Sequence, residues 1–287
     1  MGITGKIYGI NGPVISLKGN LGFKMSEMVY VGEKRLVGEV IGLTKEKTTI
    51  QVYEETSGLH PGEAVEGTGG AICVTLAPGI IHNIFDGIER PLEKIAEGNG
   101  AFIPTGVNVT PLDKEKLWET HITVKEGDYV RSGSVIAEVP ETKSILHKVM
   151  VPPGTEGIVR KVQPDGSYNI DRELVTIENA KGELVPLTMT QKWPIRIPRP
   201  IEKRYPADRP LVTGQRILDT LFPIAKGGTA ALPGGFGTGK TMTQHQLAKW
   251  CDADVIIYIG CGERGNEMTN VLEEFGELVD PKSGNLL

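Results

Sequence analysis

The first part of the chain, residues 3–70, alternates short apolar runs with polar turns. Val, Ile, Thr and Tyr dominate these runs, as in "PVISLKG" and "KTTIQVYEET", and glycine-containing turns separate them. This pattern predicts short β-strands. Strands that are so short and so close together bury little surface unless their sheet curls, so we expect a small β-barrel over residues 1–72.

Residues 73–110 have a different pattern, which we interpret as a connector and the start of a later domain. The stretch "IIHNIFDGIERPLEKIAE" has apolar residues at helical spacing from Ile80 to Ile88 and is interrupted by Pro91. This spacing predicts a helix over residues 80–88.

Residues 111–188 read as a second β-rich unit, an insertion bounded by Pro111 and Pro186. Its pattern "EGDYVRSGSVIAEVPETKS…VPPGTEGIVRKV" resembles the flattened barrel of lipoyl and biotinyl domains, in which a lysine on an exposed hairpin carries the cofactor. Lys143 is the nearest candidate for that role and Lys148 the next. The alternative is a barrel of the same shape that carries nothing, and we favour it because no companion cofactor chemistry occurs elsewhere in the sequence.

The remaining residues, 189–287, begin with a connector rich in Pro and Arg, which we expect to be extended. A short amphipathic helix is predicted in "GQRILDTLFPIAKGG". After it, "TAALPG" predicts a strand, a glycine-rich loop follows, a helix is expected over Lys240 to Trp250, and "DVIIYIGC" predicts a second strand. The order strand, loop, helix, strand is typical of nucleotide-binding α/β domains.

Composition and charge narrow the possible classes of protein. A formal net charge of −5 gives no general reason to expect nucleic-acid binding. No apolar run approaches the length of a membrane span, and the first residues lack the apolar core of a signal peptide. The cysteines have no metal-ligand spacing, and we expect reduced thiols in a cytoplasmic protein. They are Cys73, Cys251 and Cys261.

The glycine-rich loop, "GGFGTGKT", fits the G-x-x-x-x-G-K-[ST] pattern of phosphate-binding loops. A helix N-terminus attracts anions because its first N–H groups are free, and glycines let the backbone approach the phosphates closely. Lys240 would neutralise the β- and γ-phosphates, and the hydroxyl of Thr241 would bind Mg²⁺. The candidate nucleotide-binding residues are Gly234, Gly235, Phe236, Gly237, Thr238, Gly239, Lys240 and Thr241.

A second group of candidate residues occurs in "GCGERGNEM", at the end of the second predicted strand. Ligands of open α/β sheets bind at this edge. A carboxylate there, Glu263, could orient or deprotonate the water that attacks the γ-phosphate, and Arg264 could bind phosphate oxygens.

The stretch from "RPIEKRYPADRP" through the loop to "GCGERGNEM" closely resembles the catalytic A subunit of archaeal-type and vacuolar-type rotary ATPases. "APGIIHNIFDGIERPLE" and the insertion at residues 111–188 resemble the same family. The resemblance implies that Glu263 is the catalytic carboxylate, that Arg264 contacts phosphate and that Phe236 lies near the nucleotide. The family usually has Pro or Ala where Gly235 stands, and Ser or Cys where Thr238 stands.

The resemblance further implies a multidomain α/β protein with an N-terminal β-barrel, a lipoyl-like insertion and the first part of a P-loop NTPase domain. It implies ATP or ADP and Mg²⁺ as ligands, B subunits in an alternating ring, central and peripheral stalk subunits, and a membrane reached only through partners. Members of the family continue well beyond the residue that corresponds to Leu287. We therefore expect an N-terminal portion of a longer subunit, inactive in hydrolysis by itself, which would couple ATP turnover to H⁺ or Na⁺ transport.

Three alternatives remain open on the sequence alone. A secretion-system ATPase also carries a Gly-Glu-Arg stretch after its loop, and a transcription-termination helicase has a related core. The insertion argues against both, and the acidic balance argues against the helicase. For the isolated portion, a non-catalytic interaction module is the third alternative.

Overall fold

The computed structural model describes residues 2–81, 83–100, 102–143, 145–235, 237–276 and 278. The chain divides into two compact units, Met1–Pro200 and Ile201–Leu287. None of the helices in these described ranges is both long and apolar enough to cross a bilayer. The finer boundaries expected from the sequence, at residues 72, 110 and 188, stay predictions.

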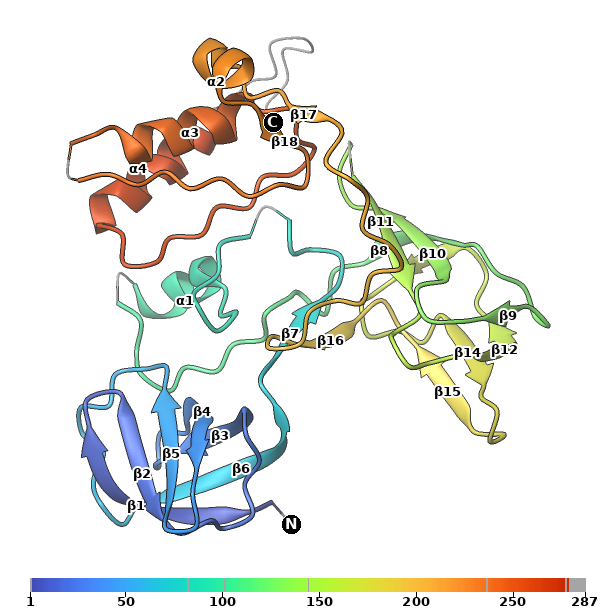
Figure 1. Ribbon diagram of the computed structural model, residues 1–287. Helices are drawn as coiled ribbons and strands as arrows, with labels where there is room; N and C mark the ends of the chain where they lie inside the picture. Colours follow the sequence, from blue (N-terminus) through green and yellow to red (C-terminus); the bar gives the residue numbers. More distant parts are fainter. Residues whose placement is uncertain are drawn as a thin grey trace. The chain divides into compact units, whose positions relative to one another are not determined.

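Six strands at the N-terminus form a closed barrel, as the sequence predicted (Figure 1). Their order is β1-β2-β5-β4-β3-β6, and β6 pairs back with β1. Alternate side chains point inward, so Ile15, Val29 and Ile50 are fully buried at 0% exposure. The strands are β1 (Thr4–Asn11), β2 (Val14–Lys18), β3 (Glu27–Val31), β4 (Leu36–Leu43), β5 (Lys47–Val52) and β6 (Ala64–Ala71).

A two-stranded ribbon connects the barrel to the inserted module. β7 (Cys73–Leu76) follows the barrel and pairs antiparallel with β16 (Gln191–Pro194) (Figure 1). The chain thus enters and leaves the residues between them through neighbouring strands. This topology is that of an insertion.

The helix of the connector lies further along the chain than the apolar spacing predicted. α1 spans Leu92–Asn99, directly after Pro91, whereas the described part of residues 80–88 forms turns and irregular backbone. Proline suits a helix start because its fixed φ is helical and its missing N–H would be unpaired there in any case. The carboxylate of Asp86 accepts two backbone N–H groups and stabilises a turn instead. The prediction of a helix over residues 80–88 was therefore wrong.

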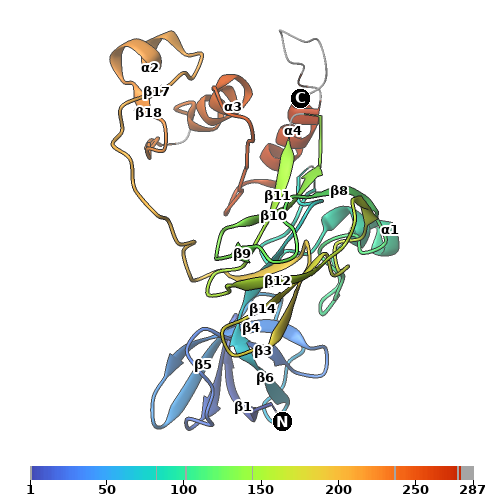
Figure 2. The same cartoon turned by 90° about the vertical axis from the view of Figure 1, so that its right-hand side faces the viewer.

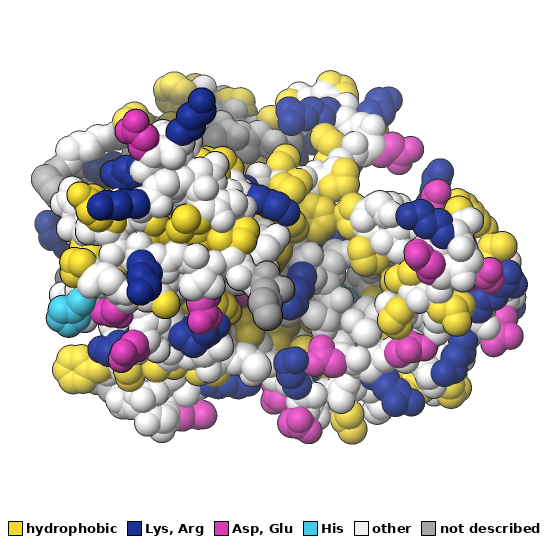
Figure 3. Space-filling model, turned by 90° about the horizontal axis from the view of Figure 1, so that it is seen from below, with side chains coloured by type: hydrophobic (Ala, Val, Ile, Leu, Met, Phe, Trp, Pro, Cys, Tyr) yellow, Lys and Arg dark blue, Asp and Glu magenta, His cyan; other side chains and the backbone are white. Residues whose placement is uncertain are grey.

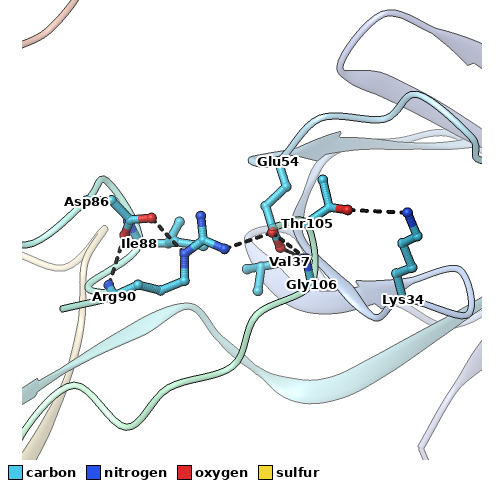
Figure 4. A network of polar contacts seen from close by, with 8 residues as sticks. All are labelled: Lys34, Val37, Glu54, Asp86, Ile88, Arg90, Thr105 and Gly106. Atoms are coloured by element: carbon cyan, nitrogen blue, oxygen red, sulfur yellow. Dashed lines mark hydrogen bonds and ion pairs between the residues drawn. The ribbon is translucent and has the colours of Figure 1, made fainter. Parts of the chain in front are cut away.

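A buried polar network joins this connector to the barrel (Figure 4). The guanidinium of Arg90 donates to Asp86 at 2.7 Å and to Glu54 at 2.8 Å. The side chain of Glu54 is only 4% exposed, and it also accepts the backbone N–H groups of Val37 and Gly106. Each oxygen of this buried carboxylate therefore has a donor, as burial of a charge requires.

The inserted module consists of two four-stranded sheets, with orders β11-β10-β8-β13 and β15-β14-β12-β9 (Figures 1 and 2). Ile136, Val139 and Ile177 are fully buried between them. The β-rich insertion predicted from the sequence is confirmed. Its strands are β8 (Trp118–Ile122), β9 (Tyr129–Val130), β10 (Val135–Pro140), β11 (Leu146–Met150), β12 (Gly157–Val162), β13 (Gly166–Tyr168), β14 (Val175–Glu178) and β15 (Leu184–Leu187).

The two lysines considered as carriers lie in one hairpin of this module. Lys143 is exposed in the connection between β10 and β11, and Lys148 lies within β11. Lys148 is paired across the ladder with Glu138. Lys143 thus has the hairpin position that the lipoyl resemblance gave it, and nothing in the fold tests whether it is modified.

Acidic and basic side chains alternate over the face of the molecule drawn in Figure 3, with apolar patches among them. Such a mixture of signs is typical of a solvated protein surface. It accords with the small formal net charge of −5 over the whole chain.

The second unit contains three helices and one small ribbon in its described residues. The predicted helix that follows the glycine-rich loop is confirmed as α3 (Lys240–Trp250), and the short amphipathic helix is α2 (Arg216–Leu221). β17 (Pro210–Leu211) pairs with β18 (Ile224–Ala225), and α4 spans Gly265–Gly276.

The two strands predicted beside α3 are absent from the described residues, so that part of the prediction was wrong. Residues 229–234 and 255–260 have no ladder partner in those ranges. Ile257 is 82% exposed and Ile259 is 81% exposed. A run this apolar is typical of a central strand covered on both faces. A strand exists only through its neighbours, and the described part of this unit supplies none for the segment.

Candidate nucleotide site

The glycine-rich loop leads directly into α3 and leaves the start of that helix open. Gly237 and Gly239 have φ values of +75° and +81°, in the left-handed region that favours glycine. Gly239 precedes the first helical residue, Lys240, and no side chain caps the helix there. The first N–H groups of α3 therefore have no side-chain cap, and with the helix dipole they favour an anion.

Hydrogen bonds within the loop fix its curvature. The hydroxyl of Thr238 donates to the carbonyl oxygen of Gly235 at 2.9 Å. A Cβ atom at Gly234 would lie 2.5 Å from that same hydroxyl oxygen, so glycine is required there while Thr238 keeps this position. Phe236, which the resemblance placed near the nucleotide, lies outside the described residues.

The ammonium group of Lys240 is folded back over the loop. It donates to the carbonyl oxygens of Gly234 and Gly235, the second at 3.1 Å. These neutral carbonyls compensate only part of its charge, so the group remains attractive to a polyanion held by the loop. Thr241 follows in the first turn of α3 and is partly buried.

The hydroxyl of Thr241 is an oxygen ligand of the kind that Mg²⁺ prefers. No cluster of three or more His, Cys, Asp or Glu side chains that could hold a metal occurs in the part of the chain that the structure describes. This donor set fits a cation that takes most of its ligands from phosphates and water, as Mg²⁺ commonly does.

Glu263 and Arg264 lie in the turn between residues 255–260 and α4. Both are exposed, and the carbonyl oxygen of Arg264 accepts the N–H groups of Glu267 and Met268 in the first turn of the helix. Burial, and next the negative charge of Glu263, raise the pKa of Tyr258, so the Glu263 carboxylate acts on that phenol. Within the described ranges, no hydrogen bond or ion pair joins Glu263 to Lys240 or Thr241.

The helices that carry the two groups of candidate residues are joined directly. Lys249 near the end of α3 forms a 2.5 Å ion pair with Glu274 near the end of α4. His245 of α3 packs against the rings of Tyr258 and Phe275. Sequence reasoning missed His245 and Tyr258, and the only available signal was that His245 lies one helical turn after Thr241.

Three family models match the chain. Residues 7–69 match the beta-barrel domain of the ATP synthase alpha/beta family, and residues 214–283 match its nucleotide-binding domain. Residues 109–196 match the ATP synthase alpha/beta subunit barrel-sandwich domain. The matches correspond to the barrel, the inserted module and the second unit.

Curated relatives match over nearly the whole chain. The V-type ATP synthase alpha chain of Halothermothrix orenii is 56% identical over 280 residues, which cover 98% of this chain and 48% of that protein. The A subunit of the A-type ATP synthase of Methanopyrus kandleri is 53% identical over 285 residues, covering 99% and 48%. The chain thus spans about half the length of the curated relatives it matches.

A solved structure, the assembled ATPase EscN of the type III secretion system of enteropathogenic E. coli, is similar with a TM-score of 0.52. The alignment covers 98% of this chain and 46% of that one, at 16% sequence identity. At such low identity the likeness concerns the fold alone.

Proposed function

This chain belongs to the ATP synthase alpha/beta family, as a relative of the A-type and V-type alpha subunits, and we propose that it acts in the catalytic subunit of a rotary ATPase. In that role it would bind Mg-ATP or Mg-ADP and couple hydrolysis or synthesis to the movement of H⁺ or Na⁺. The observation that carries the proposal is the loop of residues 234–241, which opens an uncapped helix within a nucleotide-binding domain of this family.

We assign the site residues by their chemistry. The backbone of the loop and the Lys240 ammonium would hold the phosphates, and the Thr241 hydroxyl would bind Mg²⁺. Mg²⁺ bound there would neutralise charge on the phosphates. Glu263 would orient or deprotonate the attacking water, and Arg264 would bind phosphate oxygens.

The partners follow from the family. We propose an alternating ring with B subunits, contacts with central and peripheral stalk subunits, and a cytoplasmic position beside a membrane that only partner subunits enter. We also propose that residues 111–188 contact stator subunits. The return of the chain through the β7–β16 ribbon supports an insertion that stands apart from the nucleotide domain.

The secretion-ATPase alternative is the weaker one. Its support is a likeness of fold at 16% identity, against 56% identity to a V-type alpha chain. The barrel-sandwich match over residues 109–196 also favours the rotary ATPase.

The test of this proposal is Lys240→Ala in the full-length protein, assembled with its partners. We expect ATP hydrolysis to be lost while thermal stability is retained, because the ammonium contacts only carbonyls of its own loop. Lys226→Ala is the matched control, since Lys226 forms an exposed ion pair with Asp252 elsewhere in the same unit. Hydrolysis by the Lys240→Ala enzyme at the rate of the control would overturn the proposal.

A further inference from the structure

A buried histidine with incomplete hydrogen bonding lies between the two groups of candidate residues. His245 is 3% exposed, and its Nδ1 atom has no hydrogen-bond partner among the described residues. Buried polar atoms normally have partners, so an exception calls for an explanation. The roles proposed for the phosphate loop and for Glu263 do not use this side chain.

The surroundings of His245 come from three elements. Its Nε2 atom lies 3.4 Å from the hydroxyl oxygen of Tyr258, in the segment that leads to Glu263. Its ring meets those of Tyr258 and Phe275 edge to face, with centroids 5.7 and 5.9 Å apart. On the Nδ1 side, the nearest charged group is the Glu274 carboxylate of α4 at 3.9 Å.

The charges in this cluster select one tautomer of the imidazole. The pKa of Tyr258 is raised, first by burial, so the phenol keeps its proton and can donate it to Nε2. The hydrogen bond from Lys249 lowers the pKa of Glu274, so that carboxylate stays charged on the opposite side. A neutral imidazole that accepts at Nε2 must carry its proton on Nδ1, which then faces Glu274.

We propose that His245 is a positioning residue whose contact with Tyr258 holds the phosphate-loop helix against the segment that carries Glu263. α3 begins at Lys240 and Thr241, and Tyr258 stands shortly before Glu263 in the chain, so one side-chain contact joins both halves of the site. For its catalytic consequence this inference rests on the proposed function; for the contact itself it does not.

The first arm of the test measures the contact without turnover. Long-range ¹H–¹⁵N spectra of the full 287-residue chain report the tautomer of each imidazole, and His245→Gln assigns the signal. We expect the Nδ1–H form for His245 at neutral pH, and a loss of that preference in Tyr258→Phe. His60, whose side chain is 79% exposed, is the internal control with an ordinary tautomer mixture. The same mixture at His245 would overturn the proposal.

The second arm measures catalysis by the full-length protein in its assembled enzyme. Tyr258→Phe keeps the ring and removes the hydroxyl, and we expect kcat to fall about tenfold at an unchanged KM, as loss of about 1.4 kcal/mol of coupling would give. Tyr205→Phe removes the same hydroxyl from a side chain that is 80% exposed and should leave kcat unchanged.

His245→Gln and His245→Leu separate positioning from packing. The amide oxygen of Gln can still accept from Tyr258, so His245→Gln should retain several times the kcat of His245→Leu. Equal kcat values for the two variants, or a wild-type kcat for Tyr258→Phe, would overturn the proposal. If His245→Leu does not fold, Tyr258→Phe decides. An active Lys240→Ala enzyme would refute the proposed function, whereas the spectra would still decide whether the contact exists.

Discussion

Replacing Arg90 by leucine should destabilise the first unit strongly, because it leaves a buried carboxylate without its cation. The side chains of Arg90 and Glu54 are 13% and 4% exposed, and their ion pair is 2.8 Å long. Removing one partner of a buried pair costs about 3–5 kcal/mol. Glu54 keeps two backbone N–H donors, from Val37 and Gly106, so we expect the lower end, about 3 kcal/mol.

Thermal denaturation measures this effect. For 150–250 residues, each kcal/mol moves Tm by about 2–4 °C, so Arg90→Leu should lower the Tm of the first unit by roughly 6–12 °C. The matched control is Arg160→Leu in the same unit. Arg160 pairs with Glu178, but these side chains are 50% and 33% exposed, and such surface pairs contribute about 0–1 kcal/mol.

A double variant tests the assigned cause. In the Arg90→Leu background, Glu54→Gln removes the uncompensated charge and should cost less than it does in the wild type. Equal Tm losses for Arg90→Leu and Arg160→Leu, or strictly additive losses in the double variant, would refute the reasoning from burial.

Two further predictions concern the candidate catalytic residue and the inserted module. Glu263→Gln in the assembled enzyme should keep nucleotide binding and lower the hydrolysis rate by about 10²–10⁴-fold, the usual contribution of a general base; a loss below about tenfold in a steady-state assay would assign the role to another group. Lys143 and Lys148 should both be unmodified after native expression, and an intact mass raised by lipoate or biotin would contradict a purely structural module.

The sequence predicted those parts of the fold that local patterns determine. The strands of the barrel and of the insertion alternate apolar and polar residues between glycine turns, and both modules were found. α3 was found because the loop motif marks its first residue. Lys240 and Glu263 were singled out as candidates from motif and spacing, and their roles stay predictions.

The misses have physical causes that no local pattern contains. Pro91 can interrupt one helix or begin another, and the turn held by Asp86 decides between them. The segment 255–260 is apolar enough for a strand, yet a strand needs ladder partners from elsewhere in the chain. The contact of His245 with Tyr258 joins different elements, so only the folded arrangement reveals it.

Closure of the N-terminal barrel determines how this module can meet a neighbour. Because β6 pairs back with β1, both sides of every barrel strand are occupied and the barrel has no edge strand. An edge strand is a template for backbone pairing with another chain, and closure removes it. The barrel can therefore contact other proteins only through side chains and turns. Its specificity must lie in surface composition, and single surface substitutions can change its partner without disturbing the ladder.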